Sequence, residues 1–331
     1  MNMILMSENR KPIIRLAGTG TATIDWGDGS ENDVITISID YELAWHVYTG
    51  DTIHVINVYG DNITGLDCFK NQITNLDVSN NTALKELNCF NNQLTSLDIS
   101  NNTALEVLAC GCNRIIKSLD VSNNTALKKF DCRCNRIKSL DVSYNTVLDE
   151  LKCCDNEIKS LDISNNIALT ELDCSKNKLT VLDVSNNTAL KVLYCDFNEI
   201  RSLDVSNNIA LTELGCSNNK LTGLDVSENT ALKKLWCSNT GITSLDVNNN
   251  HALIKLDCSH NLLTSLDVSE NTALVLFFCS GNKITGLDLS NNTELEVLDC
   301  SKNELTSLDV SNNTALKNWE CDKNVIVTKE K

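Results

Sequence analysis

Leucines and one cysteine recur at fixed positions along most of this chain, with polar residues between them. The repeating unit is 21 residues long and reads L-x-x-L-x-C-x-x-N-x-L-T-x-L-D-V-S-x-N-T-A, as in residues 84–104. The cysteine marks thirteen units, at Cys68, Cys89, Cys110, Cys132, Cys153, Cys174, Cys195, Cys216, Cys237, Cys258, Cys279, Cys300 and Cys321. Successive cysteines are 21 residues apart, except that 22 residues separate Cys110 from Cys132. A fixed period of this length predicts a solenoid in which each unit forms one turn.

The residues around each cysteine alternate between hydrophobic and variable, which predicts a short strand in every turn. In L-x-C the leucine and the cysteine point inward, and the residues on either side of the cysteine point to solvent. Stacked turns then pair these strands in parallel, and L-x-x-L-x-[L/C]-x-x-N is the motif of a leucine-rich repeat. We therefore predict a mainly β leucine-rich-repeat solenoid of about 12–13 units. Its parallel sheet is expected on the concave face and irregular turns on the convex face.

Residues 13–60 lack the repeat and contain runs of β-branched and aromatic residues separated by Gly, Asn and Asp. This pattern predicts a small antiparallel β cap with a hairpin turn at 27–30, where glycine supplies positive φ angles. A solenoid end exposes a slice of hydrophobic core, and we expect Trp26, Trp45 and Tyr48 to cover it. The chain is thus expected to divide into a tail at 1–12, the cap at 13–60, the solenoid at 61–327 and a C-terminal tail at 328–331.

Three polar positions recur in the units. The Asn three residues after the cysteine and the Asn of S-x-N can bond backbone groups where the chain leaves the sheet. The Asp of L-D-V-S, from Asp77 to Asp309, can accept the backbone N–H of the Ser two residues later. A calcium ladder along these carboxylates is the alternative, although calcium-binding β-rolls have glycine-rich loops that these units lack. Both explanations of the Asp positions stay open.

Thirteen of the sixteen cysteines form the column that marks the repeat, and we expect buried free thiols there. Adjacent parallel strands are about 4.8 Å apart, whereas the Cβ atoms of a disulfide are about 3.8 Å apart. A small thiol can instead fill a leucine position in the core. Cys112 and Cys134 hold the same place in consecutive units, near the end of the predicted strand, and both free thiols and a disulfide stay open for them. The extra residue of the longer unit lies in 114–117 and is expected to enlarge its convex turn.

The formal net charge of −16 makes the chain a poor candidate for nucleic-acid binding, which requires clustered Lys and Arg. No apolar run is long enough to span a membrane. The histidines have no nucleophile or carboxylate at a fixed spacing, so we expect no enzyme activity, no metal and no cofactor. Residues 1–6 are apolar but lack the basic start and the cleavage site of a signal peptide. The protein is cytoplasmic if Met1 is the natural start; otherwise a leader has been removed.

The cysteine in a core leucine position, the 21-residue period and the sequence L-T-x-L-D-V-S-x-N-T resemble the cysteine-type repeats of internalin J-like bacterial surface proteins. The resemblance covers residues 61–327. It implies an adhesin or binding scaffold that is secreted or located at the cell surface. Residues 26–30, W-G-D-G-S, followed by His46-x-Tyr48, resemble the signatures of PKD-like β-sandwich domains. This second resemblance implies a PKD-like module in the cap.

Recognition by a repeat scaffold depends on the variable positions of its exposed face. The position before the cysteine is aromatic in three units, each two units apart, at Tyr194, Trp236 and Phe278. The other residues expected near them on the concave face are Val192, Asp196, Phe197, Lys234, Lys255 and Asp257. Exposed aromatics with polar neighbours are typical of interaction sites, although scattered surface aromatics are also common.

From these positions we predict a non-enzymatic, adhesin-like binding scaffold that is monomeric and recognises a protein or glycan ligand through its concave face. Spaced aromatic rings suit sugar rings and protein loops equally, so the sequence does not choose between these ligands. The alternative is a structural or assembly module without a ligand of its own. The effect on binding of replacing the concave aromatics would separate the two.

Overall fold

The computed structural model describes residues 2–50, 52–113 and 116–329, and all regular elements in them are β-strands. The chain forms two compact units, Met1–Leu169 and Thr170–Lys331. Unit 1 holds the cap and the first solenoid turns, and unit 2 holds the later turns. The described residues include no helix with the length and apolarity that a membrane crossing requires.

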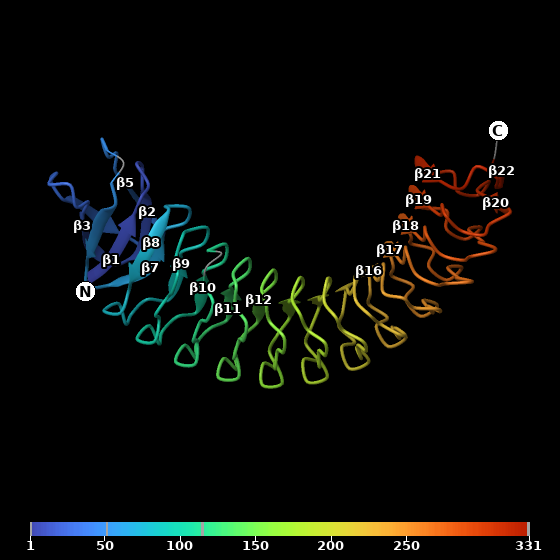
Figure 1. Ribbon diagram of the computed structural model, residues 1–331, viewed down its shortest axis with the longest axis horizontal. Helices are drawn as coiled ribbons and strands as arrows, with labels where there is room; N and C mark the ends of the chain where they lie inside the picture. Colours follow the sequence, from blue (N-terminus) through green and yellow to red (C-terminus); the bar gives the residue numbers. More distant parts are fainter. Residues whose placement is uncertain (1, 51, 114–115, 330–331) are drawn as a thin grey trace. The chain divides into compact units, whose positions relative to one another are not determined.

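Each solenoid turn contributes one short strand to a parallel sheet, as the alternating pattern predicts (Figure 1). In unit 1 these strands are β7 (Ile63–Asp67), β9 (Glu86–Asn88), β10 (Val107–Ala109), β11 (Lys129–Asp131) and β12 (Glu150–Lys152). In unit 2 they are β13 (Glu171–Asp173), β14 (Val192–Tyr194), β15 (Glu213–Gly215), β16 (Lys234–Trp236), β17 (Lys255–Asp257), β18 (Leu276–Phe278), β19 (Val297–Asp299) and β21 (Asn318–Glu320). The predicted leucine-rich-repeat solenoid is confirmed.

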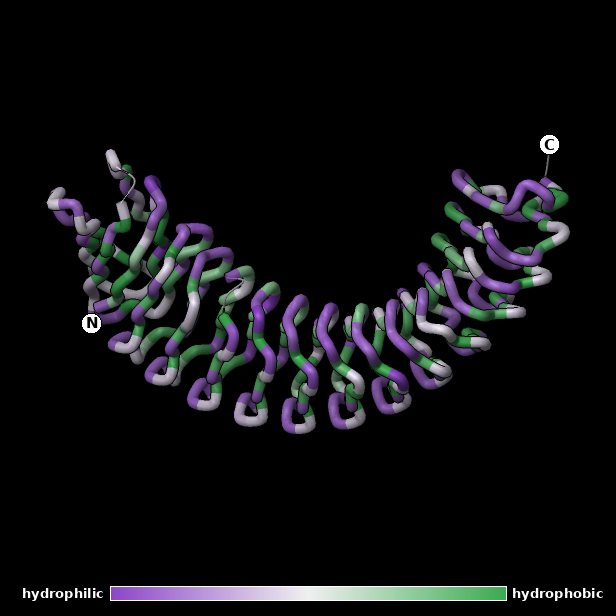
Figure 2. Tube along the Cα trace, in the orientation of Figure 1, coloured by the Kyte–Doolittle hydropathy of each residue, from purple (hydrophilic) through white to green (hydrophobic). Residues whose placement is uncertain are grey.

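The core of each unit consists of the inward leucines and cysteines. Leu193 and Cys195, like their equivalents in neighbouring turns, are fully buried, and Figure 2 shows the hydrophobic stretches recurring from turn to turn. The column cysteines from Cys68 to Cys300 are buried free thiols, and Cys321 in the last turn is half-buried. Their ladder therefore packs as a column of small hydrophobic groups, as expected.

Two columns of asparagine side chains join successive turns by hydrogen bonds. Asn198, three residues after its cysteine, donates from Nδ2 to the carbonyl oxygens of Cys195 (3.0 Å) and Cys174 (3.1 Å). Asn208, the Asn of S-x-N, donates to the carbonyl oxygens of Val184 (3.0 Å) and Asn187 (2.9 Å). Each amide bonds at least one carbonyl group of the turn before it, which explains why asparagine recurs at these two positions along the solenoid.

The cap contains a five-stranded antiparallel sheet in the order β4-β3-β6-β1-β8. Its strands are β1 (Asn2–Ser7), β3 (Gly20–Asp25), β4 (Asp33–Ile37), β6 (His54–Tyr59) and β8 (Ile73–Asp77). Two further strands, β2 (Ile13–Gly18) and β5 (Glu42–Trp45), pair with each other in antiparallel fashion, and β2 also pairs with β7 of the first turn. The predicted turn at 27–30 joins β3 to β4.

Residues 1–12 were expected to be a tail, but they include β1, which pairs with β6 and β8. The strand forms because Met3, Leu5 and Ser7 alternate with more exposed residues and are fully buried. At the other end of the chain, β22 (Ile326–Thr328) pairs in parallel with β20 (Ser307–Asp309). The domain boundaries at 12/13, 60/61 and 327/328 stay predictions.

The cap aromatics differ from expectation in one residue. Trp26 and Tyr48 are buried, and the Tyr48 hydroxyl donates to the carbonyl oxygen of Trp26 (2.7 Å). Trp45 is 59% exposed, so it does not cover the core. The reason is the alternation of β5, in which Ala44 points inward and its neighbours Leu43 and Trp45 point outward. The enlarged turn predicted at 114–117 cannot be compared, because residues 114 and 115 lie outside the described residues.

Candidate ligand-binding site

The three predicted aromatic residues lie in one row on the solvent face of the sheet in unit 2. Tyr194, Trp236 and Phe278 end β14, β16 and β18, and the parallel register places Gly215 and Asp257 between them. All three aromatic side chains are half-buried, because the residue before each of them, a leucine or Phe277, and the cysteine after it occupy the core. The alternation of the strand thus presents the rings to solvent.

Tyr194 and Trp236 are in contact although they are two turns apart. Their ring centroids are 6.0 Å apart with an interplanar angle of 67°, which is an edge-to-face arrangement. Gly215 makes this contact possible. A Cβ atom on Gly215 would lie 2.9 Å from Tyr194 Cδ1 and 2.4 Å from Asp196 Oδ2. The missing side chain in the middle turn lets the two rings meet above it.

Charged side chains contact the aromatic rings. The Lys255 ammonium lies 5.1 Å from the ring centroid of Trp236 and 5.9 Å from that of Phe278. A cation at this distance is attracted by the face of an aromatic ring. Glu213 accepts hydrogen bonds from the Tyr194 hydroxyl and from Lys234 Nζ, the latter at 2.8 Å. The rings are therefore fixed by neighbours before any ligand arrives.

A shallow depression of about 390 Å³ opens beside the ring pair. Its lining consists of Tyr194, Asp196, Phe197, Ser217, Asn218, Trp236 and Ser238. Phe197 is 53% exposed and has a φ angle of 54°, in the left-handed region that is unusual for a bulky residue. Asp196 Oδ1 accepts the backbone N–H of Ser217 at 2.8 Å. The depression thus combines aromatic faces, two hydroxyls and one carboxyl group.

Of the nine predicted site residues, Tyr194, Asp196, Phe197 and Trp236 line the depression. Val192, Lys234, Lys255, Asp257 and Phe278 lie on the same sheet face outside it, in β14 and in β16 to β18. Ser217, Asn218 and Ser238 were not predicted as site residues. They hold the first or second position after their cysteines, as Asp196 and Phe197 do, so the repeat alignment was the signal that could have identified them.

Replacement of Asp196 by Asn is expected to change how stability depends on pH. Burial raises the pKa of Asp196 from its ordinary 3.8 to about 6, so the folded protein binds this proton more tightly than the unfolded chain. Asp196 therefore contributes less to the stability of the fold as pH rises from 3.8 to about 6. The Asn side chain in Asp196→Asn can still accept the Ser217 N–H. We expect this variant to be more stable than wild type at neutral pH, and its stability should no longer decrease over this pH range. Urea unfolding at several pH values measures both effects.

Asp204→Asn is the matched control. The backbone and hydroxyl hydrogen bonds from Ser206 lower the pKa of the exposed Asp204 carboxyl, which is the opposite direction. Its contribution is present at neutral pH and is lost as pH falls, so this variant should lose stability at neutral pH. A fall in wild-type stability between pH 4 and 6 that persists in Asp196→Asn would contradict the role given to Asp196.

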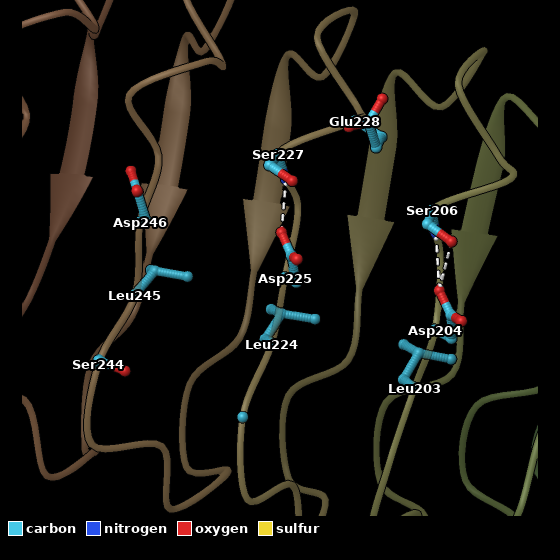
Figure 3. Close-up of a pocket in the computed structure, with 11 residues that line it drawn as sticks. Leu203, Asp204, Ser206, Leu224, Asp225, Ser227, Glu228, Ser244, Leu245 and Asp246 are labelled. Atoms are coloured by element: carbon cyan, nitrogen blue, oxygen red, sulfur yellow. Dashed lines mark hydrogen bonds between the residues drawn. The ribbon is translucent and has the colours of Figure 1, made fainter.

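A second, larger depression of about 860 Å³ lies over the L-D-V-S segments of three turns in unit 2 (Figure 3). Its lining includes Asp204, Asp225, Asp246 and Glu228. Asp204 and Asp225 accept the backbone N–H of the Ser two residues later, at 3.0 and 2.9 Å, as predicted. Among the described residues no group of three or more His, Cys, Asp and Glu side chains is arranged to hold a metal ion. The observed bonds account for the Asp positions, and the calcium ladder stays the alternative.

The chain is similar to several proteins of known structure. No family model and no curated protein matches the chain. The functional domain of InlJ from Listeria monocytogenes, which includes a cysteine ladder, is 40% identical, with a TM-score of 0.69 over 79% of this chain and 54% of that one. The chain is an internalin J-like leucine-rich-repeat protein. It spans about half the length of the InlJ structure.

Two more distant structures agree in fold with the internalin J-like chain. The internalin InlF from Listeria monocytogenes is 23% identical, with a TM-score of 0.73 over 80% of this chain and 82% of that one. YopM from Yersinia enterocolitica is 24% identical, with a TM-score of 0.60 over 81% of this chain and 60% of that one. At such identities the likeness shows the solenoid fold alone.

Proposed function

We propose that the internalin J-like chain is a non-enzymatic, adhesin-like binding scaffold that recognises a protein or glycan ligand through the sheet face of unit 2. The observation that carries this proposal is the contact of Tyr194 with Trp236 over Gly215, beside an open depression. The likeness to internalins supports a secreted or surface location. We also take the chain to act as a monomer.

The arrangement has the features of a binding hot spot. Tyr and Trp supply large contact areas with few rotatable bonds, and they dominate the binding energy of many interfaces. Glu213 and Lys255 hold the rings in place, so little side-chain freedom is lost when a ligand binds. Ser217, Ser238 and Asp196 add hydrogen-bonding groups at the rim that suit sugar hydroxyls or a peptide backbone.

Loss of the ring pair is expected to abolish specific binding without unfolding the protein. Wild type and the double variant Tyr194→Ala/Trp236→Ala are compared in a screen against immobilised proteins and glycans, and affinities are measured for each hit. A hot-spot residue contributes about 2 kcal/mol or more, and the effects of two residues in contact do not add fully, so we expect a loss of at least about 30-fold. Thermal unfolding of both proteins shows that the fold is kept.

Tyr144→Ala is the matched control. Tyr144 is 59% exposed and lies in the S-x-N segment of its turn, away from the sheet strands. It should bind every hit as wild type does. A ligand that binds the double variant with unchanged affinity would refute this face as the site. Absence of any specific ligand would favour the alternative, a structural or assembly module.

A further inference from the structure

Three cysteines of unit 1 lie outside the buried ladder: Cys112, Cys134 and Cys154, all half-buried thiols. Cys112 and Cys134 are each the second residue after a ladder cysteine, in consecutive turns. We propose that Cys112 and Cys134 are a disulfide-forming pair that links these two turns when a small-molecule disulfide oxidises them. The proposal concerns unit 1 and is independent of the ligand site in unit 2.

The backbone holds the two residues side by side. Strands β10 and β11 pair in register, with Ala109 opposite Asp131. The hydrogen bonds continue past the strand ends, because the N–H of Cys112 donates to the carbonyl of Arg133 at 2.7 Å. Neighbouring parallel strands are about 4.8 Å apart, and the Cα atoms of disulfides are about 4.4–6.8 Å apart. The backbone spacing therefore suits a disulfide.

The side chains at this repeat position can reach one another across consecutive turns. Cys112 and Cys134 have φ angles of 54° and 55°, the left-handed conformation found at this position in most turns. In unit 2 the equivalent Asn239 donates from Nδ2 to Asn218 Oδ1 at 2.8 Å, across consecutive turns. A Cβ atom on Gly281, also at this position, would lie 2.5 Å from the His260 ring of the turn before it. The position thus directs side chains of successive turns toward each other.

The ladder cysteines from Cys68 to Cys300 are less accessible to an oxidant than Cys112 and Cys134. They are buried, and the Sγ atoms of Cys68 and Cys258 point at backbone carbonyls of the next turn, at 3.4 and 3.6 Å. Cys112 and Cys134 are partly exposed. Burial, the Cys112 side chain and Asp155 raise the pKa of Cys134 to about 12. Cys134 therefore keeps its proton at neutral pH, which favours it as the thiol that reacts second.

The reaction is a thiol–disulfide exchange in two steps. The thiolate of one cysteine attacks a small-molecule disulfide such as oxidised glutathione, forms a mixed disulfide, and releases a small thiolate that takes up a proton. The second cysteine then loses its proton, attacks the protein sulfur of the mixed disulfide and releases the second small thiol. The protein has lost two protons and two electrons, and the small disulfide has gained them.

The full chain is treated with oxidised glutathione under native conditions, free thiols are alkylated, and the non-reduced digest is analysed by mass spectrometry. We expect a peptide pair joined through Cys112 and Cys134, lighter by two hydrogen atoms than the reduced pair. A dithiol reductant should remove the link. Cys112→Asn and Cys134→Asn should each abolish it and leave a glutathione adduct on the remaining cysteine.

The variants follow residues that the chain itself has at these repeat positions, so the fold is expected to be kept. Asn stands at the second position after the cysteine in other turns, where Asn91 and Asn218 also have positive φ angles. Cys154→Ser introduces the Ser found at the first position in many turns, and it should retain the link. A link between Cys134 and Cys154, or oxidation that yields mixed disulfides alone on Cys112 and Cys134, would overturn the proposal.

Discussion

Asn208→Ala is expected to destabilise the protein by about 1–3 kcal/mol, since it removes one hydrogen bond from each of two buried carbonyl groups. Asn208 is fully buried and bonds Val184 and Asn187 of the turn before it. Each carbonyl keeps one backbone N–H donor, from Asn187 and Leu190, but loses its second bond in a site that water does not reach, and alanine is too short to replace the amide. Urea unfolding followed by circular dichroism measures the loss as a lower transition midpoint.

The neighbouring Asn207 supplies the control for this prediction. Asn207 is exposed, and its Nδ2 donates at 3.3 Å to the carbonyl of Ser185. Because water can replace that bond, Asn207→Ala should cost about 0.5 kcal/mol or less. Equal effects of the two substitutions would mean that the buried asparagines stabilise the fold no more than an exposed asparagine does. In a solenoid each turn contacts its neighbours, so the transition of Asn208→Ala should also become broader.

Gly27→Ala is expected to cost about 3–5 kcal/mol and to disrupt the cap. Gly27 has a φ angle of 75°, and a Cβ atom there would lie 2.2 Å from the carbonyl oxygen of Val55 in β6. That oxygen belongs to the backbone of a central cap strand, so it cannot move without breaking the sheet. Hydrogen exchange by mass spectrometry should show faster exchange in β3, β4 and β6, with little change in the distant turns of unit 2.

Gly29→Ala separates backbone strain from steric conflict. Gly29 lies in the same turn with a φ angle of 83°, but a Cβ atom there would have no neighbour within 4 Å. It should cost about 1–2 kcal/mol, the usual penalty of a left-handed conformation for alanine. If Gly27→Ala lost no more stability than Gly29→Ala, the close approach of the Val55 carbonyl would not be the reason that this position requires glycine.

The candidate site was only partly visible in the sequence. The aromatic residues at Tyr194, Trp236 and Phe278 could be placed on the solvent face, because strand alternation fixes which side chains point outward. The contact between Tyr194 and Trp236 could not, since it depends on how far two side chains reach across the empty position at Gly215. The left-handed conformation of Phe197 was also hidden, because Phe does not favour it locally.

The sequence by itself determined the solenoid: its period, the inward leucines and cysteines, and the Asp–Ser turn bonds all follow from rules that operate within one unit and between identical neighbours. Only the tertiary structure decided how the cap is built. Strand β1 pairs with β8, with Leu5 opposite Leu76, and Trp45 stays in solvent while Trp26 is buried. Such pairings join segments far apart in the chain, and several alternating runs of similar hydrophobicity could occupy the same place in a sheet. The choice among them depends on how all the strands pack together, which no local pattern records.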